Sequence, residues 1–232
     1  MYTIGKIKGL NQDEITAIKN LVEFVLPQDY LTFLSEYGFG EINEILHFQI
    51  PDKEFVRNNF SDYLYLWDWT TELQKESALN GLTIATTYDG DTVCCVDNDE
   101  LPYLLLPRHS SEPIEFEKFT FYISDISDYF KKLKTDNLYF DTNCNREMKY
   151  ISLIKNGQLD KELISKIHKS FLEKYQFDKV FNEDIQPKYI MQEIGGWVYF
   201  DLLNFGSSIR VKYQSMFEQK ANEIIDFIEQ QI

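Results

Sequence analysis

Apolar residues recur with helical spacing near the start of the chain, between Leu26 and Gly40. Pro27 suits the first position of a helix, where the N–H that proline lacks would have no partner, and Gly38 suits the position after the last turn. The residues between them that fall at i, i+3, i+4 and i+7 are Tyr30, Phe33, Leu34 and Tyr37. This spacing predicts a short amphipathic helix whose aromatic face lies in the core.

The preceding residues predict a second helix, from Asn11 to Leu26. Asn11 can cap its first turn, and Glu14 stands three residues later, as in a capping box. The following proline breaks the helical pattern between the two segments. The expected buried face consists of Ile15, Ile18, Leu21, Val22 and Val25.

Past these helices the pattern predicts one strand and two further helices. We expect a strand over 42–48, a short polar helix over 52–59 and an aromatic helix over 61–78. Because the third segment carries aromatic residues on all sides, it is not a simple surface helix. Trp67 is expected in the core, and Trp69 is left open between core and interface.

Short apolar runs separated by turn signals then predict an antiparallel β-meander. Asp89-Gly90 is the strongest of these turn signals. A closing helix is expected from Ser124, which suits its N-cap, to Leu133. The expected strands cover residues 82–87, 92–96, 103–106 and 114–116, with a further apolar stretch at 119–123.

The remaining residues predict a smaller α+β region. The polar segment 131–137 is the expected boundary, so the fold class is α+β with an N-terminal domain over 1–133 and a C-terminal region over 138–232. The elements expected after the boundary are a helix over 159–175, a loop over 182–188, a three-stranded meander over 189–194, 197–202 and 208–213, and a final helix over 215–232.

Charge is distributed unevenly along the chain. Of the net charge of −15, residues 1–133 carry −13, from 10 Lys and Arg against 23 Asp and Glu, and residues 134–232 carry −2, from 13 against 15. An acidic surface repels phosphate backbones, which argues against direct nucleic-acid binding, and it attracts basic proteins. Solubility alone is the alternative explanation of the charge.

The expected cellular compartment follows from two kinds of segment that the sequence lacks, a membrane helix and a secretory signal. No apolar run approaches the roughly 18 residues that a membrane helix needs, and the first residues lack the apolar core of a secretory signal. The three cysteines, Cys94, Cys95 and Cys144, show no ligand spacing, and an odd count argues for reduced thiols. We therefore expect a cytoplasmic protein without membrane contact.

The sequence patterns that could indicate a catalytic or metal site are all incomplete. From Asp89 to Glu100 acidic residues stand at positions 1, 3, 9 and 12 of a calcium loop, but Val93 and Cys94 occupy positions 5 and 6, where a ligand and a glycine are required. No glycine-rich phosphate loop occurs, and the serine pairs lack a base in the sequence nearby. We expect no cofactor, no metal and no catalytic residue.

The chain resembles the SUKH superfamily in two stretches, LPQDYLTFLSEYGFG and LTIATTYDGDTVCCVDNDELPYLLLPRHSSEPIEF, the second followed by FTFYISDISDYF. This fold is shared by fungal cell-wall-synthesis regulators and many bacterial immunity proteins. The resemblance covers about residues 1–133. The corresponding features are Leu26-Pro27, the aromatic helix Tyr30 to Gly38, the Gly90-Asp91 hairpin and the closing helix Ser124 to Leu133. The chain departs from the family at residues 37–40, where many members carry Asn-Gly-Gly.

The resemblance implies a non-catalytic domain that acts by binding another protein. In bacteria that partner is usually a polymorphic toxin, often a nuclease or a deaminase. Our first hypothesis is therefore an immunity protein that occludes a basic cognate toxin. The second is a regulatory scaffold of the cell-wall-assembly-regulator type, and the third is an enzyme that uses carboxylates of the second half.

Two acidic groups are the candidate partner-binding residues. One group recurs every four residues on the helix expected over 61–78, with a tryptophan beside it, and the other lies on the hairpin turns of the meander. The first group is Asp68, Trp69, Glu72 and Glu76. The second group is Asp91, Asp97, Asp99 and Glu100.

Overall fold

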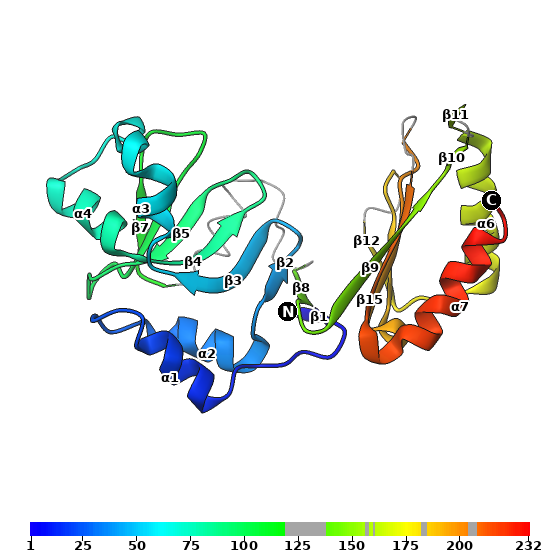
Figure 1. Cartoon of the computed structure of the whole chain (residues 1–232), viewed down its shortest axis with the longest axis horizontal. Helices are drawn as coiled ribbons and strands as arrows, with labels where there is room; N and C mark the ends of the chain where they lie inside the picture. The colour runs from blue at the N-terminus through cyan, green and yellow to red at the C-terminus, as the bar shows by residue number, and fades with distance from the viewer. Residues whose placement is uncertain (119–137, 156–157, 160, 182–184, 204–207) are drawn as a thin grey trace. The chain divides into compact units, whose positions relative to one another are not determined.

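The computed structural model describes residues 1–118, 138–155, 158–159, 161–181, 185–203 and 208–232 (Figure 1). Three segments expected from the sequence lie outside the described residues: the apolar stretch 119–123, the closing helix Ser124 to Leu133 and the boundary at 131–137. The chain forms two compact units. The first contains Met1–Thr3 and Ile7–Thr142, and the second contains Ile4–Lys6 and Asn143–Ile232.

Helix α1 (Gln12–Lys19) begins as its sequence predicts. The Asn11 side chain accepts hydrogen bonds from the backbone N–H groups of Asp13 and Glu14, and the Glu14 carboxylate accepts one from the Asn11 N–H, which completes the capping box. The expected end at Leu26 is wrong, because the helix stops at Lys19. Residues 20–26 are not helical, and Val25, expected in the buried face, is 89% exposed.

Helix α2 (Gln28–Tyr37) carries the predicted aromatic face. Tyr30, Phe33 and Leu34 are buried, and Pro27 is the N-cap rather than the first helical residue. The helix ends at Gly38, whose φ is +72° and whose N–H donates to the Leu34 carbonyl. A Cβ at Gly38 would lie 2.2 Å from the Lys8 carbonyl oxygen, so only glycine fits both the backbone angle and the space.

The expected strand over 42–48 is instead a hairpin. Strand β2 (Gly40–Ile42) and strand β3 (Leu46–Asp52) pair antiparallel, with Ile42 opposite Leu46. Asn43 and Glu44 between them both have positive φ, which is the geometry of a tight hairpin turn. Neither residue is glycine, so no glycine turn signal marks the hairpin in the sequence.

The first unit holds a mixed sheet with the strand order β1-β8-β2-β3-β4-β5-β6-β7. The pairs from β8 to β7 along this order are antiparallel. The expected meander is confirmed in β4 to β7. The strands not yet given are β1 (Tyr2–Ile4), β4 (Leu82–Thr87), β5 (Thr92–Cys95), β6 (Tyr103–Leu106), β7 (Ile114–Phe116) and β8 (Tyr139–Thr142).

This sheet is buried on both faces. Successive side chains of a strand point to opposite sides, so Val93 and Cys95 join a cluster with α1 and α2, while Cys94 and Val96 join a second cluster with Val56 and other residues of the opposite side. Figure 1 shows α1 and α2 beneath the sheet and α3 (Phe55–Phe60) and α4 (Glu72–Asn80) above it. Burial on both faces explains the continuous apolar runs of β5 and β6.

The single helix expected over 61–78 is wrong. A 3-10 helix, η1 (Ser61–Leu66), is followed by an extended segment, and α4 starts only at Glu72. The Trp67 backbone is extended because its indole is buried, where its N–H donates to the Pro107 carbonyl at 2.8 Å. The Thr71 hydroxyl then accepts the Gln74 N–H and caps α4.

The second unit is an antiparallel sheet with the order β12-β13-β14-β15-β9, covered on one face by α6 (Lys161–Lys174) and α7 (Glu218–Glu229) (Figure 1). The expected meander is confirmed as β13 to β15, but the sequence reading missed β9 and β12. The strands are β9 (Arg146–Ser152), β12 (Lys179–Phe181), β13 (Lys188–Met191), β14 (Gly196–Phe200) and β15 (Ser208–Gln214). Short elements are the pair β10 (Ile154–Lys155) and β11 (Gln158–Leu159) and the 3-10 turns η3 (Gln192–Ile194) and η4 (Ser215–Phe217).

Residues Ile4–Lys6 complete this second unit from the other end of the chain. The Gln214 side chain is 1% exposed and makes two hydrogen bonds with the backbone of Lys6, accepting its N–H at 2.8 Å and donating to its carbonyl at 2.9 Å. The Gly5 N–H donates to Gln192 and the Arg146 guanidinium donates to the Ile4 carbonyl. Among the described residues of the chain, no helix is both long and apolar enough to cross a membrane.

Candidate partner-binding cleft

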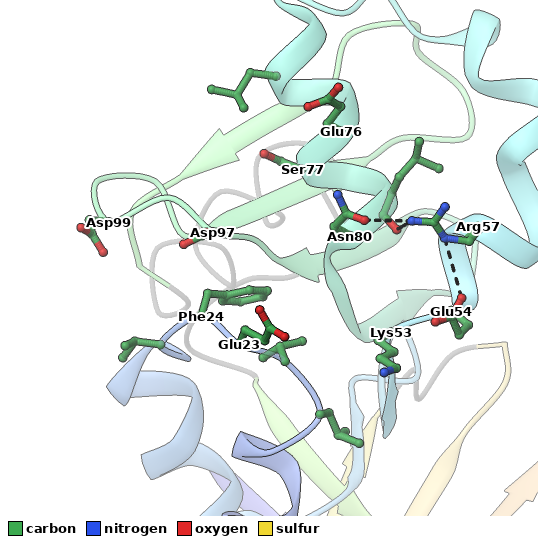
Figure 2. A pocket seen from close by; sticks show the side chains of 15 residues that line it. Glu23, Phe24, Lys53, Glu54, Arg57, Glu76, Ser77, Asn80, Asp97 and Asp99 are labelled. Carbon is green, nitrogen blue, oxygen red and sulfur yellow. Dashed lines mark hydrogen bonds and ion pairs between the residues drawn. The ribbon is translucent and has the colours of Figure 1, made fainter.

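A cleft of about 820 Å³ opens on the first unit, among four segments that are distant in sequence. These segments are the loop after α1, the start of α3, the helix α4 and the turn after β5. Figure 2 shows Phe24 and Glu23 on one side of the opening, Glu76 on the other, and Asp97 with Asp99 at one end.

Arg57 holds one wall of the cleft together. Its guanidinium donates to the Asn80 side-chain oxygen at 2.8 Å and to the Leu79 carbonyl at 3.4 Å, and it lies 3.7 Å from the Glu54 carboxylate (Figure 2). These contacts tie α3 to the C-terminal end of α4. The cation of Arg57 is therefore already engaged, and it offsets the charge of Glu54.

Four other carboxylates of the cleft have no such partner. Glu23, Glu76, Asp97 and Asp99 are exposed, and none forms an ion pair with a residue that the structure describes. Lys53 is the remaining cation of the lining. With five carboxylates against two cations, the cleft carries a net formal charge of −3, which favours a positively charged occupant.

Apolar side chains border the same cleft. Val25 is 89% exposed and Leu73 is 71% exposed, although both are aliphatic. Phe24, which also lines the cleft, is half-buried and packs against the core cluster of the α1–α2 side. The early end of α1 leaves residues 20–26 outside the helix and so brings Phe24 and Val25 to the cleft. Exposed aliphatic residues beside unpaired charges are typical of a protein-binding surface.

The structure brings together three of the eight predicted partner-binding residues, Glu76, Asp97 and Asp99. Two others are exposed nearby but do not line the cleft. Glu72 forms an ion pair with Lys75 at 2.8 Å, one turn before Glu76 on α4, and Glu100 follows Asp99 in the same turn.

Asp68 and Trp69 lie apart from this group. Because α4 begins at Glu72, the expected stripe of Asp68, Glu72 and Glu76 on one helical face does not exist. Asp68 accepts a hydrogen bond from the Ser111 hydroxyl at 2.5 Å, and its N–H donates to the Ser111 carbonyl. Trp69 is half-buried, and its indole N–H donates to the Leu64 carbonyl at 2.7 Å. Both residues therefore stabilise local structure.

The prediction that Asp91 is an exposed partner-binding residue on the hairpin turns is wrong. It is only 1% exposed, so it cannot lie on a surface that meets a partner. Its carboxylate accepts hydrogen bonds from the Thr87 hydroxyl and from the Arg108 N–H, both at 2.8 Å. These bonds fix the β4–β5 hairpin to the strand end of β6. The sequence showed an acidic turn residue, and only the fold shows that its side chain points inward.

Strand β5 (Thr92–Cys95) runs through the Asp89–Glu100 segment and separates its acidic residues. Within the described ranges no three His, Cys, Asp or Glu residues are grouped so as to hold a metal ion. Cys94 and Cys95 are buried in β5, and burial raises the pKa of the Cys94 thiol to about 12, partly offset by a hydrogen bond with Thr83. A thiol of this kind is protonated and unreactive at neutral pH.

Comparisons with known proteins gave no match: no family model, no curated protein and no solved structure is similar to this chain.

Proposed function

We propose that the chain is an immunity protein that binds a basic cognate toxin, a nuclease or a deaminase, and neutralises it by occlusion. The observation that carries this proposal is the cleft, where unpaired Glu23, Glu76, Asp97 and Asp99 lie beside exposed Val25 and Leu73. The resemblance of residues 1–133 to the SUKH superfamily supports the same conclusion from the sequence.

The two kinds of side chain have different tasks in this proposal. The carboxylates attract a basic protein over a distance set by the Debye length, about 8 Å at physiological salt, and so raise the rate of association. Val25 and Leu73 lose their contact with water in the complex, and this apolar burial slows dissociation. Occlusion requires both, because a rapid but short-lived complex leaves the toxin active.

The test compares charge reversals inside and outside the cleft. The cleft variants are Glu76→Lys and the pair Asp97→Lys with Asp99→Lys. The matched controls are Glu72→Lys, one turn away on the same helix, and Glu100→Lys, the next residue in the same turn. Each single reversal changes the net charge by the same amount, so Glu76→Lys is compared with either single control. The Asp97→Lys, Asp99→Lys pair is compared with the double control Glu72→Lys, Glu100→Lys, so that position alone differs in each comparison.

Binding is measured against the protein encoded beside this gene, by stopped-flow kinetics at low and high salt, with cell survival on co-expression as the functional readout. We expect the double cleft variant to associate about tenfold more slowly at low salt and the controls to change much less. Equal effects of variants and controls would refute the cleft as the binding site. A chain that neither binds nor protects against that protein would refute the immunity function and favour the regulatory scaffold.

A further inference from the structure

A second cavity of the first unit, of about 620 Å³, lies away from the cleft described above. It opens between the segment of α3 and η1 and the loop that follows β6. Its apolar walls are aromatic or cyclic for the most part: Phe60, Tyr63, Leu66, Trp67 and Pro107. The volume falls within the range of roughly 300–1,000 Å³ that small-molecule sites occupy.

The ring faces in this cavity are held in place by contacts within the unit. Phe60 and Trp67 meet edge to face, with their ring centroids 5.5 Å apart. The only polar atom of the Trp67 side chain already donates to the Pro107 carbonyl at 2.8 Å. Trp67 therefore offers an apolar surface rather than a hydrogen bond, and its position is fixed before any ligand arrives.

The loop after β6 brings one cation, Arg108, to the cavity. Arg108 and His109 are exposed, and their side chains make no hydrogen bond or ion pair with any residue in the described part of the chain. Among the carboxylates of these segments, Asp68 accepts a hydrogen bond from the Ser111 hydroxyl, and Asp91 accepts from Thr87 and the Arg108 N–H. Asp62, Asp89 and Glu112 form no ion pair with Arg108 in the described part of the chain. The Arg108 guanidinium is thus available to a ligand.

Gly90 leaves room for that guanidinium. Its φ is +92°, and a Cβ there would lie 2.8 Å from the Arg108 Cδ and 2.9 Å from Nη1. The side chain of Arg108 thus lies over the β4–β5 turn, and its N–H is anchored by Asp91. Both ends of the residue are placed by the hairpin, which presents a planar donor group at the edge of an aromatic cavity.

We propose that this cavity binds a small molecule with an aromatic body and a single carboxylate. The rings of Phe60, Tyr63 and Trp67 would contact the body, and the guanidinium of Arg108 would bind the carboxylate, whose two oxygens match its planar fork. The proposal is independent of the immunity function, since it concerns other residues and another kind of ligand.

The test uses 2-naphthoate as the probe and the neutral 2-naphthamide of the same shape as its comparison, with affinities measured by titration calorimetry. We expect the full-length protein to bind naphthoate about tenfold more tightly than naphthamide, because a charge-assisted hydrogen bond is about twice as strong as a neutral one. Arg108→Gln should abolish this preference and leave naphthamide binding unchanged.

A matched aromatic pair tests the walls. Tyr63 and Tyr65 both lie on η1 and both are exposed, but only Tyr63 lines the cavity. Tyr63→Ala should weaken the binding of both probes severalfold, and Tyr65→Ala should match the parent protein. No saturable naphthoate binding at millimolar concentration, or binding that Arg108→Gln leaves unchanged, would overturn the proposal.

Discussion

Replacing Gln214 by leucine should destabilise the second unit substantially. The side chain is buried and makes three hydrogen bonds: it accepts the Lys6 N–H at 2.8 Å and donates to the carbonyls of Lys6 and Cys144 at 2.9 and 3.1 Å. Leucine has a similar volume and fills the space, but it cannot form any of these three hydrogen bonds. A buried group that loses its partner costs about 1–3 kcal/mol; because these three bonds are only partly buried, the low end applies, and we expect a loss of about 3 kcal/mol in the free energy of unfolding.

The assay is urea unfolding followed by fluorine NMR of protein labelled with 5-fluorotryptophan. Trp197 in β14 reports on the second unit, and Trp67 and Trp69 report on the first. The control is Gln230→Leu, the same substitution at an exposed position after α7. The Trp197 transition should move to lower urea in the Gln214 variant and hardly move in the control.

Two outcomes would contradict this reasoning. If the Gln214 variant and the control unfold within about 0.5 kcal/mol of each other, water satisfies the three groups and the side chain is not a structural clamp. If the Trp197 transition keeps its midpoint while those of Trp67 and Trp69 move, the assignment of residues 4–6 to the second unit is wrong.

Three further predictions concern single residues. Asn11→Ala should cost about 1 kcal/mol of unfolding free energy in the first unit, seen in the urea midpoint, because it removes both bonds of the capping side chain. In the folded protein at pH 8, Ellman's reagent should label Cys144, which is half-buried, and should reach the other two thiols only after unfolding, since both are buried with raised pKa values. Burial lowers the pKa of His168 below its usual 6.5, so as pH falls the unfolded chain takes up the proton before the folded state does. The second unit should therefore lose stability as pH falls below about 6.5. His168→Gln should reduce that loss, measured by urea titrations at about pH 7.5 and about pH 5.5.

The sequence predicts elements well where one physical signal dominates. The helix α2 has a proline before it, a four-residue aromatic face and a glycine after it, and it lies where the pattern places it, with Pro27 one position outside the helix. The strands of the meander are equally clear, because Gly90 marks a turn between two β-branched runs. The α+β class follows from these elements.

Other elements depend on contacts that only the fold creates. Residues 61–78 have helical periodicity, yet Trp67 adopts an extended backbone because its ring enters the core and its N–H reaches Pro107, 40 residues later. The turn at Asn43 and Glu44 contains no glycine or proline to mark it. At Trp67 the tertiary contact outweighs the local helical preference.

The residues of the candidate site were likewise predicted only in part from the sequence. Charge spacing selected Glu76, Asp97 and Asp99, which the fold brings to one cleft, but it also selected Asp91, which the fold buries. The apolar part of the cleft was missed because Val25 was placed on the buried face of a helix. A helix that ends at Lys19 cannot be predicted from the periodicity of residues 15–25 alone, since that periodicity continues past its end.

The hydrogen bonds that Gln192 and Gln214 make with residues 4–6 determine which of the two units can be completed first during synthesis. Gly5 and Gln192 are 187 positions apart and Lys6 and Gln214 are 208 apart, so residues 4–6 find these partners only after the chain as far as Gln214 has left the ribosome. Closing so long a loop is slow and comes late in folding. The first unit has nearly all of its sequence available once Thr142 is made, whereas the second unit becomes complete only when residues 4–6 meet the segment around Gln192 and Gln214.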